Sequence, residues 1–372
     1  MPVHSQRRIH VAVQDVSAKP LIAVAVVTFF ISLAVELKAD SPRTQLAVVK
    51  GPPLETPCDV ISLRGDDGQA VVPHAAAISP SGKVIAVGLS DQTIELWRTN
   101  LLKPLGVLGS HRDRIRSLAF SPDGRWLVSA GNDGQLKVWD IAATRVNEQY
   151  ALSHAVSQVQ FMPDSATILA IGFASHLDVL GPSRNNVELQ CTSSDLRALA
   201  AHPNGREAIV AGRDGVIQVF DIEDQRLIAK QKVHSKRIRD VAIRVDDDGV
   251  RVWSVGEDGT VAITETSSLR TLSKRRVSPG QLFALTLLPD GRAAVAGSDD
   301  TIRIIDKDGE KVIGHLHGHV GSVTQILASG EHLYSFGFDA TFRRWHLSGM
   351  EKVQQPDGDR LADAPEGSEV SR

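Results

Sequence analysis

Short apolar stretches separated by turn residues recur along the chain between residues 59 and 347. The segment 109–141 shows the unit most clearly. Apolar and polar residues alternate in it, and the turns PDG at 122–124 and NDG at 132–134 interrupt the alternation. A period of two residues, broken by Pro, Asp, Asn and Gly, is typical of antiparallel strands joined by tight turns. The pattern therefore predicts strands in this part of the chain.

The unit recurs seven times at nearly constant spacing. The position six residues after each second turn, here called the marker position, recurs at intervals of 42, 41, 40, 44, 41 and 40 residues. Its seven occupants are Trp97, Trp139, Leu180, Phe220, Thr264, Ile305 and Trp345. A period of about 40–45 residues with several strands per period is typical of one blade of a β-propeller. We predict an all-β, seven-bladed β-propeller of four-stranded antiparallel blades.

Several motifs give the repeats a family resemblance. Trp139-Asp140 ends a repeat, and Gly318-His319 opens another. Over roughly residues 59–347 the chain resembles the WD-repeat (WD40) family. In that family a His, a Ser or Thr, an Asp and a Trp of one blade form a buried hydrogen-bonded network. The resemblance implies two complete networks, formed by His111, Ser129, Asp133 and Trp139, and by His319, Ser335, Asp339 and Trp345.

The other repeats depart from the family pattern. Gln69 replaces the His in the first repeat, and Thr264 replaces the Trp in the fifth. The third repeat has Ala174 at the Asp position and is the least regular. The fourth and sixth keep Asp214 and Asp299 but lack the His. These losses predict weaker individual blades but the same number of blades, because the spacing persists.

The segment Asp59–Arg64 has no blade before it and is expected to complete the seventh blade beside Thr341–Leu347. The competing donor is Met350–Gln354 in the tail. Either closure removes the exposed strand edges of an open sheet array. The first closure puts Cys58 and Cys191 on nearly opposite blades, too far apart for a disulfide.

The N-terminus predicts export. Leu21–Val35 is a mostly apolar run of fifteen residues, preceded by Arg7, Arg8 and Lys19. A basic lead before 7–15 apolar residues is the pattern of a secretory signal. The run is also close to the ~17–25 residues of a membrane-spanning helix, so an uncleaved anchor remains the alternative.

The predicted organisation follows. Residues 1–39 are a signal peptide or signal anchor, 40–57 a Pro-rich linker, 58–347 the propeller and 348–372 a disordered polar tail. The propeller is thus expected to be periplasmic, extracellular or anchored by a single N-terminal segment. The protein is expected to contact a membrane only through residues 21–35, if this segment is not cleaved.

Composition narrows the function classes. The chain has 41 basic and 44 acidic residues, a formal charge of −3 and 42% hydrophobic residues. This near-neutral balance gives no drive toward nucleic acid, which usually needs a strongly basic domain. Two cysteines without a CxxC motif exclude a disulfide scaffold and the usual cysteine-based metal sites.

The residue patterns that could suggest catalysis or metal binding have structural explanations. The sequence holds no GxSxG, HExxH or P-loop motif. The His–Ser–Asp sets recur with a Trp in several repeats, as structural networks would, whereas a hydrolase needs one triad. His315, His317 and His319 alternate, but His319 already belongs to an expected network. We therefore predict no enzyme activity, no cofactor and no metal.

One face of the predicted propeller is the candidate binding surface. Proteins of the WD-repeat family generally bind partners at the rim where each repeat enters its inner strand. The positions that project there on this chain are Arg114, Arg116, Arg197, Arg213, Arg237, Arg239, His74, Phe283 and Phe338. Arginines recognise carboxylates and phosphates through paired hydrogen bonds, and aromatic residues favour interfaces.

These observations lead to one functional hypothesis with alternatives. The chain is expected to be a non-enzymatic, monomeric scaffold for protein–protein interactions, with a partner that carries an acidic surface. A binding module for an anionic small molecule or glycan is the alternative. A propeller hydrolase acting at the central channel is the less favoured reading.

Overall fold

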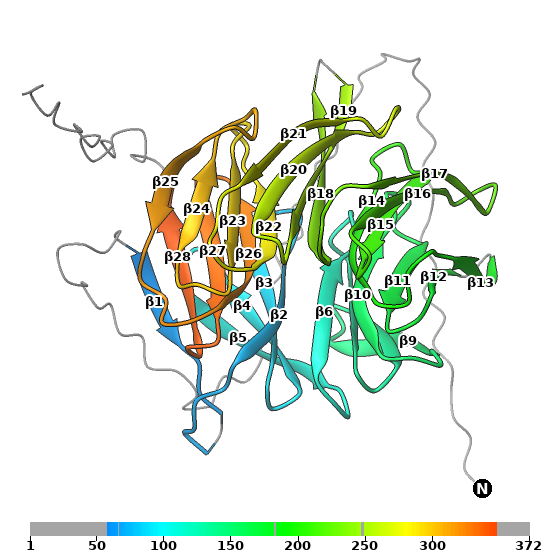
Figure 1. Cartoon of the computed structure of the whole chain (residues 1–372). Coiled ribbons are helices and arrows are strands. Elements are labelled where there is room, and N and C mark those ends of the chain that lie inside the picture. Colours follow the sequence, from blue (N-terminus) through cyan, green and yellow to red (C-terminus); the bar gives the residue numbers. More distant parts are fainter. Residues whose placement is uncertain (1–57, 66, 182–183, 247–248, 348–372) are drawn as a thin grey trace, which may run out of the picture. The chain divides into compact units, whose positions relative to one another are not determined.

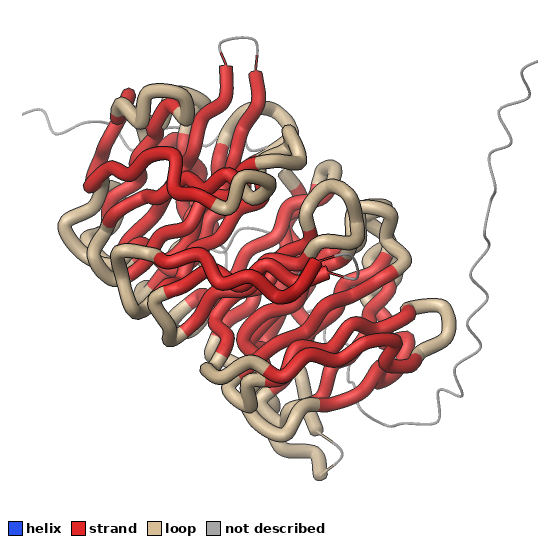
Figure 2. Tube along the Cα trace, turned by 90° about the vertical axis from the view of Figure 1, so that its right-hand side faces the viewer, coloured by secondary structure: helices blue, strands red, loops and turns tan. Residues whose placement is uncertain are grey.

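The computed structural model describes residues 58–65, 67–181, 184–246 and 249–347, all within one compact unit, Val35–Arg372. These residues form 28 strands joined by turns and loops, with no helix among them (Figures 1 and 2). In this described part, no helix is long and apolar enough to cross a membrane. The predicted signal or anchor, linker and tail (residues 1–39, 40–57 and 348–372) lie outside the described residues.

The strands pair into seven four-stranded antiparallel sheets. Blade one is β2 (Pro73–Ile78), β3 (Val84–Leu89), β4 (Thr93–Arg98) and β5 (Lys103–Ser110). Blade two is β6 (Ile115–Phe120), β7 (Trp126–Gly131), β8 (Gln135–Asp140) and β9 (Arg145–Ala151). Blade three is β10 (Val156–Phe161), β11 (Ile168–Gly172), β12 (His176–Gly181) and β13 (Arg184–Gln190).

The remaining blades follow the same order. Blade four is β14 (Leu196–Ala201), β15 (Glu207–Gly212), β16 (Val216–Asp221) and β17 (Arg226–Lys232). Blade five is β18 (Ile238–Asp246), β19 (Gly249–Gly256), β20 (Thr260–Glu265) and β21 (Thr271–Arg276). Blade six is β22 (Leu282–Leu287), β23 (Ala293–Gly297), β24 (Ile302–Ile305) and β25 (Val312–Leu316). The predicted seven-bladed all-β propeller is confirmed.

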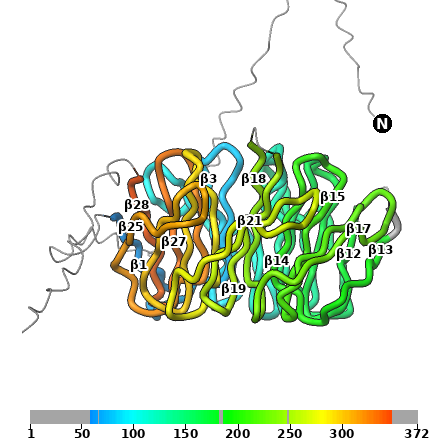
Figure 3. Tube along the Cα trace, turned by 45° about the horizontal axis from the view of Figure 1, so that its top comes forward, coloured from blue at the N-terminus to red at the C-terminus, as the bar shows by residue number. Residues whose placement is uncertain are grey.

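Blade seven joins the two ends of the described chain. It consists of β26 (Val323–Ser329), β27 (His332–Gly337), β28 (Thr341–His346) and β1 (Cys58–Ser62). β1 runs antiparallel to β28 and lies beside it in Figure 3. The predicted closure by the N-terminal segment is confirmed, although the strand begins one residue earlier than expected. The competing segment 350–354 lies outside the described residues.

The first strand of each blade, here called the inner strand, contacts the inner strands of the two neighbouring blades, including β26 with β2. Among the described residues, five polar side chains reinforce this ring by accepting backbone N–H groups of the next inner strand. Ser117 accepts from Val159 (3.1 Å), and Gln325 accepts from Ala76 across the closure (2.6 Å). Gln158 and Gln160 of blade three and Asp240 of blade five do the same.

The hydrophobic core lies between adjacent sheets. Trp139 of blade two packs among residues of blade one, and Trp345 of blade seven packs among residues of blade six. Gly109 leaves room for Trp139, because a Cβ there would lie 2.3 Å from the indole ring. The marker position thus fills the gap toward the preceding blade, which explains why it recurs as a large apolar residue in most repeats.

The two cysteines lie in different blades. Cys58 begins β1 in blade seven, and Cys191 follows β13 in blade three; neither forms a disulfide. Burial raises the pKa of Cys191 to about 12, so this thiol stays protonated and poorly nucleophilic at neutral pH.

Candidate functional site at the channel mouth

The structure brings the residues of both complete networks together. In blade two, the Trp139 indole N–H donates to Ser129 Oγ (2.8 Å), which lies 2.7 Å from His111 Nε2. His111 Nδ1 lies 3.0 Å from an Asp133 carboxylate oxygen. In blade seven the corresponding distances are 2.8, 2.7 and 2.9 Å. Each network ties the loop before an inner strand to the turn and core of the same blade.

Proton positions in blade two favour a structural role. Burial lowers the pKa of His111, so the neutral ring donates from Nδ1 to Asp133 and accepts the Ser129 hydroxyl at Nε2. Burial alone would raise the pKa of Asp133, but hydrogen bonds from the Arg112 backbone and His111 outweigh it and lower the pKa. Ser129 is fully buried, so no substrate reaches its oxygen. A nucleophilic serine needs such access.

Blades one and five depart from the family network in different ways. In blade one, where the His is absent, Glu95 accepts the Trp97 indole N–H (3.1 Å). In blade five, His234 bonds Asp258 and Ser254, both at 2.9 Å, as the family pattern implies. The Thr264 hydroxyl at the marker position of that blade is buried and finds no hydrogen-bond partner among the described residues.

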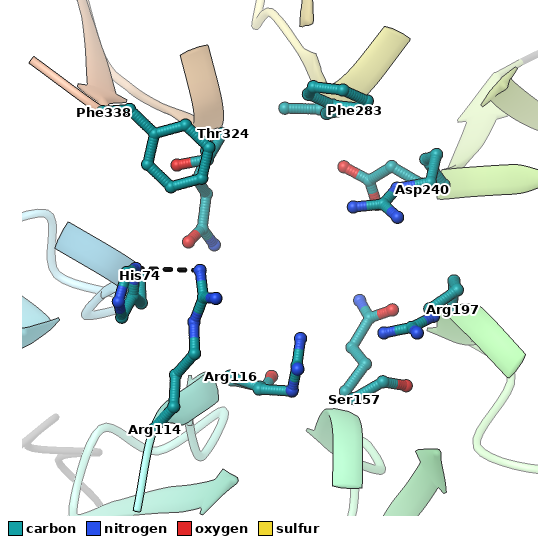
Figure 4. A pocket seen from close by; sticks show the side chains of 14 residues that line it. His74, Arg114, Arg116, Ser157, Arg197, Asp240, Phe283, Thr324 and Phe338 are labelled. Atoms are coloured by element: carbon teal, nitrogen blue, oxygen red, sulfur yellow. Dashed lines mark hydrogen bonds between the residues drawn. The ribbon is translucent and has the colours of Figure 1, made fainter. Parts of the chain in front are cut away.

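One residue from every inner strand faces a shared cavity of about 210 Å³ (Figure 4). This set, here called the channel ring, is the second residue of each inner strand. Its members are His74, Arg116, Ser157, Arg197, Arg239, Phe283 and Thr324. Since the seven blades each contribute one member, the cavity lies where the inner strands converge.

Backbone geometry explains the channel ring. In all seven blades the pairing of the inner strand with the next strand shifts register across this second residue, for example between Ile115 and Ser117. Such a bulge leaves its extra residue outside the ladder and redirects the side chain. The repeated bulge therefore delivers seven side chains to one place.

The positive charge of the cavity comes from four arginines. Arg114 joins the channel ring from just before β6, and its Nη2 lies 3.1 Å from His74 Nδ1. Arg116 bonds the amide oxygen of Asn132. The Arg116 and Arg197 guanidiniums lie 5.3 and 4.0 Å from the ring centre of Phe173. These cation–π contacts stack two cations on one aromatic ring.

Arg239 completes the set. Its guanidinium lies 5.1 Å from the ring centre of Phe283 and 3.6 Å from a Glu257 oxygen. Burial, followed by repulsion from Arg197, lowers the pKa of Arg239. Arginine still stays protonated in proteins, so the lowered pKa reports mainly the cost of burying this charge and, second, its repulsion from Arg197.

The positive charge of the cavity is only partly compensated. Arg197 pairs with Asp195 (2.7 Å), and Arg239 lies near Glu257. Arg114 and Arg116 instead bond the neutral groups His74 and Asn132. Burial first, then Arg114 and Arg116, lowers the pKa of His74 to about 4, so His74 accepts a hydrogen bond as a neutral ring. Burial raises the pKa of Asp240, which also lines the cavity, to about 7, so this carboxyl carries only part of a negative charge at neutral pH. The cavity therefore favours an anionic group.

Seven of the nine residues proposed from the sequence line this cavity, and two do not. Arg237 lies between Asp195 (2.7 Å) and Glu257 (2.9 Å), so its charge is already paired. Arg213 is exposed on the turn of blade four, outside the lining. Both residues were proposed as part of a partner-binding rim, and for them that proposal stays a prediction. Ser157, Thr324 and Phe173 were missed; only the register of the repeats could have identified them.

The fold and these sites define a β-propeller whose blades are held by recurring buried polar networks. The family model described as "WD domain, G-beta repeat" matches residues 59–98, 102–140 and 184–221. A solved β-propeller domain of Cps50 (Swd1) from Myceliophteria thermophila superposes with a TM-score of 0.66 at 16% identity, over 74% of this chain and 96% of that one. At this identity the likeness shows the fold alone.

Curated relatives agree on the family. The chain is 24% identical to apoptotic protease-activating factor 1 of Danio rerio, over 74% of this chain and 19% of that protein. It is 26% identical to protein groucho of Drosophila melanogaster, over 63% of this chain and 33% of that protein. The chain thus spans only a minor part of these two relatives. With the repeats and the fold, these matches support the assignment of this chain to the WD-repeat family. The WD-repeat relatives are scaffolds for protein interactions.

Proposed function

We propose that this protein is a non-enzymatic scaffold that binds an acidic segment of a partner protein at the channel mouth. The single observation that carries the proposal is the convergence of Arg114, Arg116, Arg197 and Arg239 on one cavity. Carboxylates accept paired hydrogen bonds from arginine, and aromatic rims exclude water from such contacts. Phe173 and Phe338 are the exposed aromatic residues of this rim.

The mode of binding follows from the cavity size. A volume of about 210 Å³ admits one or two side chains rather than a folded domain. We expect an acidic side chain or chain terminus to enter the cavity while the rest of the partner lies on the surrounding turns. Such a central anchor with a wider rim is how interface energy usually concentrates.

We further propose export, on the basis of the apolar run 21–35 and its basic flank. The propeller then works outside the cytoplasm, either released or held by this segment. Cell fractionation combined with mass spectrometry of the mature N-terminus tests this proposal. A cytoplasmic protein that retains residues 1–39 would contradict it.

An anionic small molecule or glycan is the second candidate. The same four guanidiniums favour it, and the limited cavity volume suits a single phosphate or carboxylate group. A small ligand would saturate the purified protein without any partner protein. A peptide partner needs contacts on the rim as well as in the cavity.

The test is a crosslinking capture from the native host with an Arg116→Glu, Arg239→Glu variant. The matched control is Arg145→Glu, Lys230→Glu, which changes the charge equally on the exposed outer strands β9 and β17. We expect wild type and control to retain a partner that the channel variant loses, with all three folded by circular dichroism. Equal capture by all three would contradict the channel site.

A further inference from the structure

Blade three contains a second cluster of chemically active side chains, away from the channel ring. His154, His176 and Asp178 each offer a ligand atom, and these atoms lie within 4.8 Å of one another. The side chains are 8%, 13% and 6% exposed. Among the described residues, these three form the one group of three or more His, Cys, Asp or Glu side chains that lie close enough together to share a metal ion.

Strand pairing assembles two of the three residues. His176 and Asp178 lie two positions apart on β12, so their side chains share one face of the sheet. The register pairs Asp178 with Glu188 of β13, which places Glu188 on the same face. Glu188 Oε1 lies 3.9 Å from His176 Nε2.

His154 arrives from the loop before β10, and Gly172 makes room for it. A Cβ at position 172 would lie 2.8 Å from His154 Nδ1. The two imidazole rings meet edge to face, with their centres 5.0 Å apart. The loop and the strand therefore hold both histidines against Asp178.

The hydrogen bonds of His154 leave its other nitrogen facing a carboxylate. Nδ1 lies 3.2 Å from the carbonyl oxygen of Ala155, which can only accept, so Nδ1 carries a proton. Nε2 lies 2.9 Å from Asp178 Oδ2. In a neutral ring, Nε2 would then point a lone pair at a carboxylate oxygen. Either a second proton or a cation must separate them.

His176 points to the same conclusion independently. Its Nε2 is buried and finds no hydrogen-bond partner among the described residues. Asp178 Oδ1 lies 3.5 Å away. Buried polar atoms are normally satisfied, so this nitrogen calls for an explanation. An ion bound between His176 Nε2 and Asp178 would satisfy this nitrogen.

We propose that His154, His176 and Asp178 bind a divalent transition-metal ion of the zinc type, with Glu188 or water as the fourth ligand. Two imidazole nitrogens and a carboxylate oxygen form a donor set that zinc accepts. Tetrahedral bonds of about 2.0–2.1 Å separate ligand atoms by about 3.3 Å. The Asp178 oxygens lie 2.9 Å from His154 Nε2 and 3.5 Å from His176 Nε2, and all three ligand atoms lie within 4.8 Å of one another. The His154 Nδ1–H to carbonyl bond is the second contact that ligating histidines usually make.

The ion would have a structural role. Blade three lacks both the Asp of the turn and the marker Trp, so it has no family network. A cation held by His154 and Asp178 would tie the loop before β10 to β12. It would thus do for this blade what the His111–Asp133 contact does for blade two.

The test uses the untagged full-length chain, stripped with a chelator and titrated with Co²⁺ and Zn²⁺. We expect one equivalent of Co²⁺ with the visible absorption of a tetrahedral site, displaced by Zn²⁺. Asp178→Asn and His176→Gln should each weaken Zn²⁺ binding at least about tenfold, because loss of a ligand costs no less than loss of its supporting contact. His315→Gln, which alters a histidine on blade six, is the matched control.

A second readout separates metal binding from misfolding. Zn²⁺ should raise the melting temperature of wild type and of His315→Gln, but not that of His176→Gln, since a ligand stabilises only the state that binds it. Wild type that binds neither ion would overturn the proposal. Binding that is unchanged in both site variants would overturn it equally.

Discussion

Blades two and three hold their inner strands with different chemistry. In blade two a turn residue, Asp133, meets His111, and Ser129 extends the chain of hydrogen bonds to Trp139. In blade three the corresponding turn residue is Ala174, and the carboxylate that meets the loop histidine comes from the middle of β12. Both blades have a histidine in the loop before the inner strand, but the carboxylate that it contacts comes from a different position in each blade.

The difference shows which part of a repeat the fold requires. Both blades need a loop fastened to the sheet and an apolar residue at the marker position, which is Leu180 in blade three. Different sets of side chains can meet both requirements. In blade three, a carboxylate on β12, which pairs with β11 and β13, meets the loop histidine that a turn carboxylate meets in blade two.

Trp139→Ala gives the largest expected effect. The change opens a cavity between blades one and two and removes the donor to Ser129, so we expect a loss of about 3–5 kcal/mol in the free energy of unfolding. Urea denaturation measures it, with Leu180→Ala in blade three as the comparison. A loss below about 1 kcal/mol would contradict a buried network in blade two.

An intermediate effect is expected from acid in blade seven. Burial alone would raise the pKa of Asp339, but bonds from His319, Thr341 and the Val320 backbone outweigh it and lower the pKa to about 2. A lowered carboxylate pKa stabilises the fold above pH ~4, and that stability is lost as the pH falls toward 2. The contribution is about 2 kcal/mol.

Comparison of wild type with Asp339→Asn isolates this contribution. The difference in urea midpoint should be largest near neutral pH and should vanish near pH 2. Asp308→Asn in an exposed turn serves as the control and should track wild type throughout. A difference that is constant with pH would argue against the charge of Asp339 as its origin.

The smallest effect is expected from restoring the family residue in blade three. Ala174→Asp should change the free energy of unfolding by less than about 0.5 kcal/mol, because His154 already faces Asp178. The reverse change in blade two, Asp133→Ala, should cost about 1–3 kcal/mol by leaving buried donors without an acceptor. Stabilisation by more than 1 kcal/mol from Ala174→Asp would mean that blade three lacks a working substitute.

Local patterns in the sequence were sufficient to predict the fold. Alternating apolar residues, Asp turns and a period near 41 residues specify strands, hairpins and blade number, since each depends on neighbours within one repeat. The networks of blades two and seven were predictable for the same reason. The closing strand was predictable because an unpaired strand before the first repeat has one free edge to occupy.

The candidate sites depended on contacts between repeats. Seven bulged residues become one channel ring only after the ring closes, which is why Ser157 and Thr324 escaped notice. Arg237 lies outside the cavity lining and pairs with Asp195, just before the first strand of blade four, and with Glu257 in the turn of blade five. The cluster around Asp178 likewise arises from strand register. Hydrophobic periodicity depends on residues that are close together in the sequence. Charge pairing and ligand geometry depend on distances between residues that only the packing of the folded chain brings together.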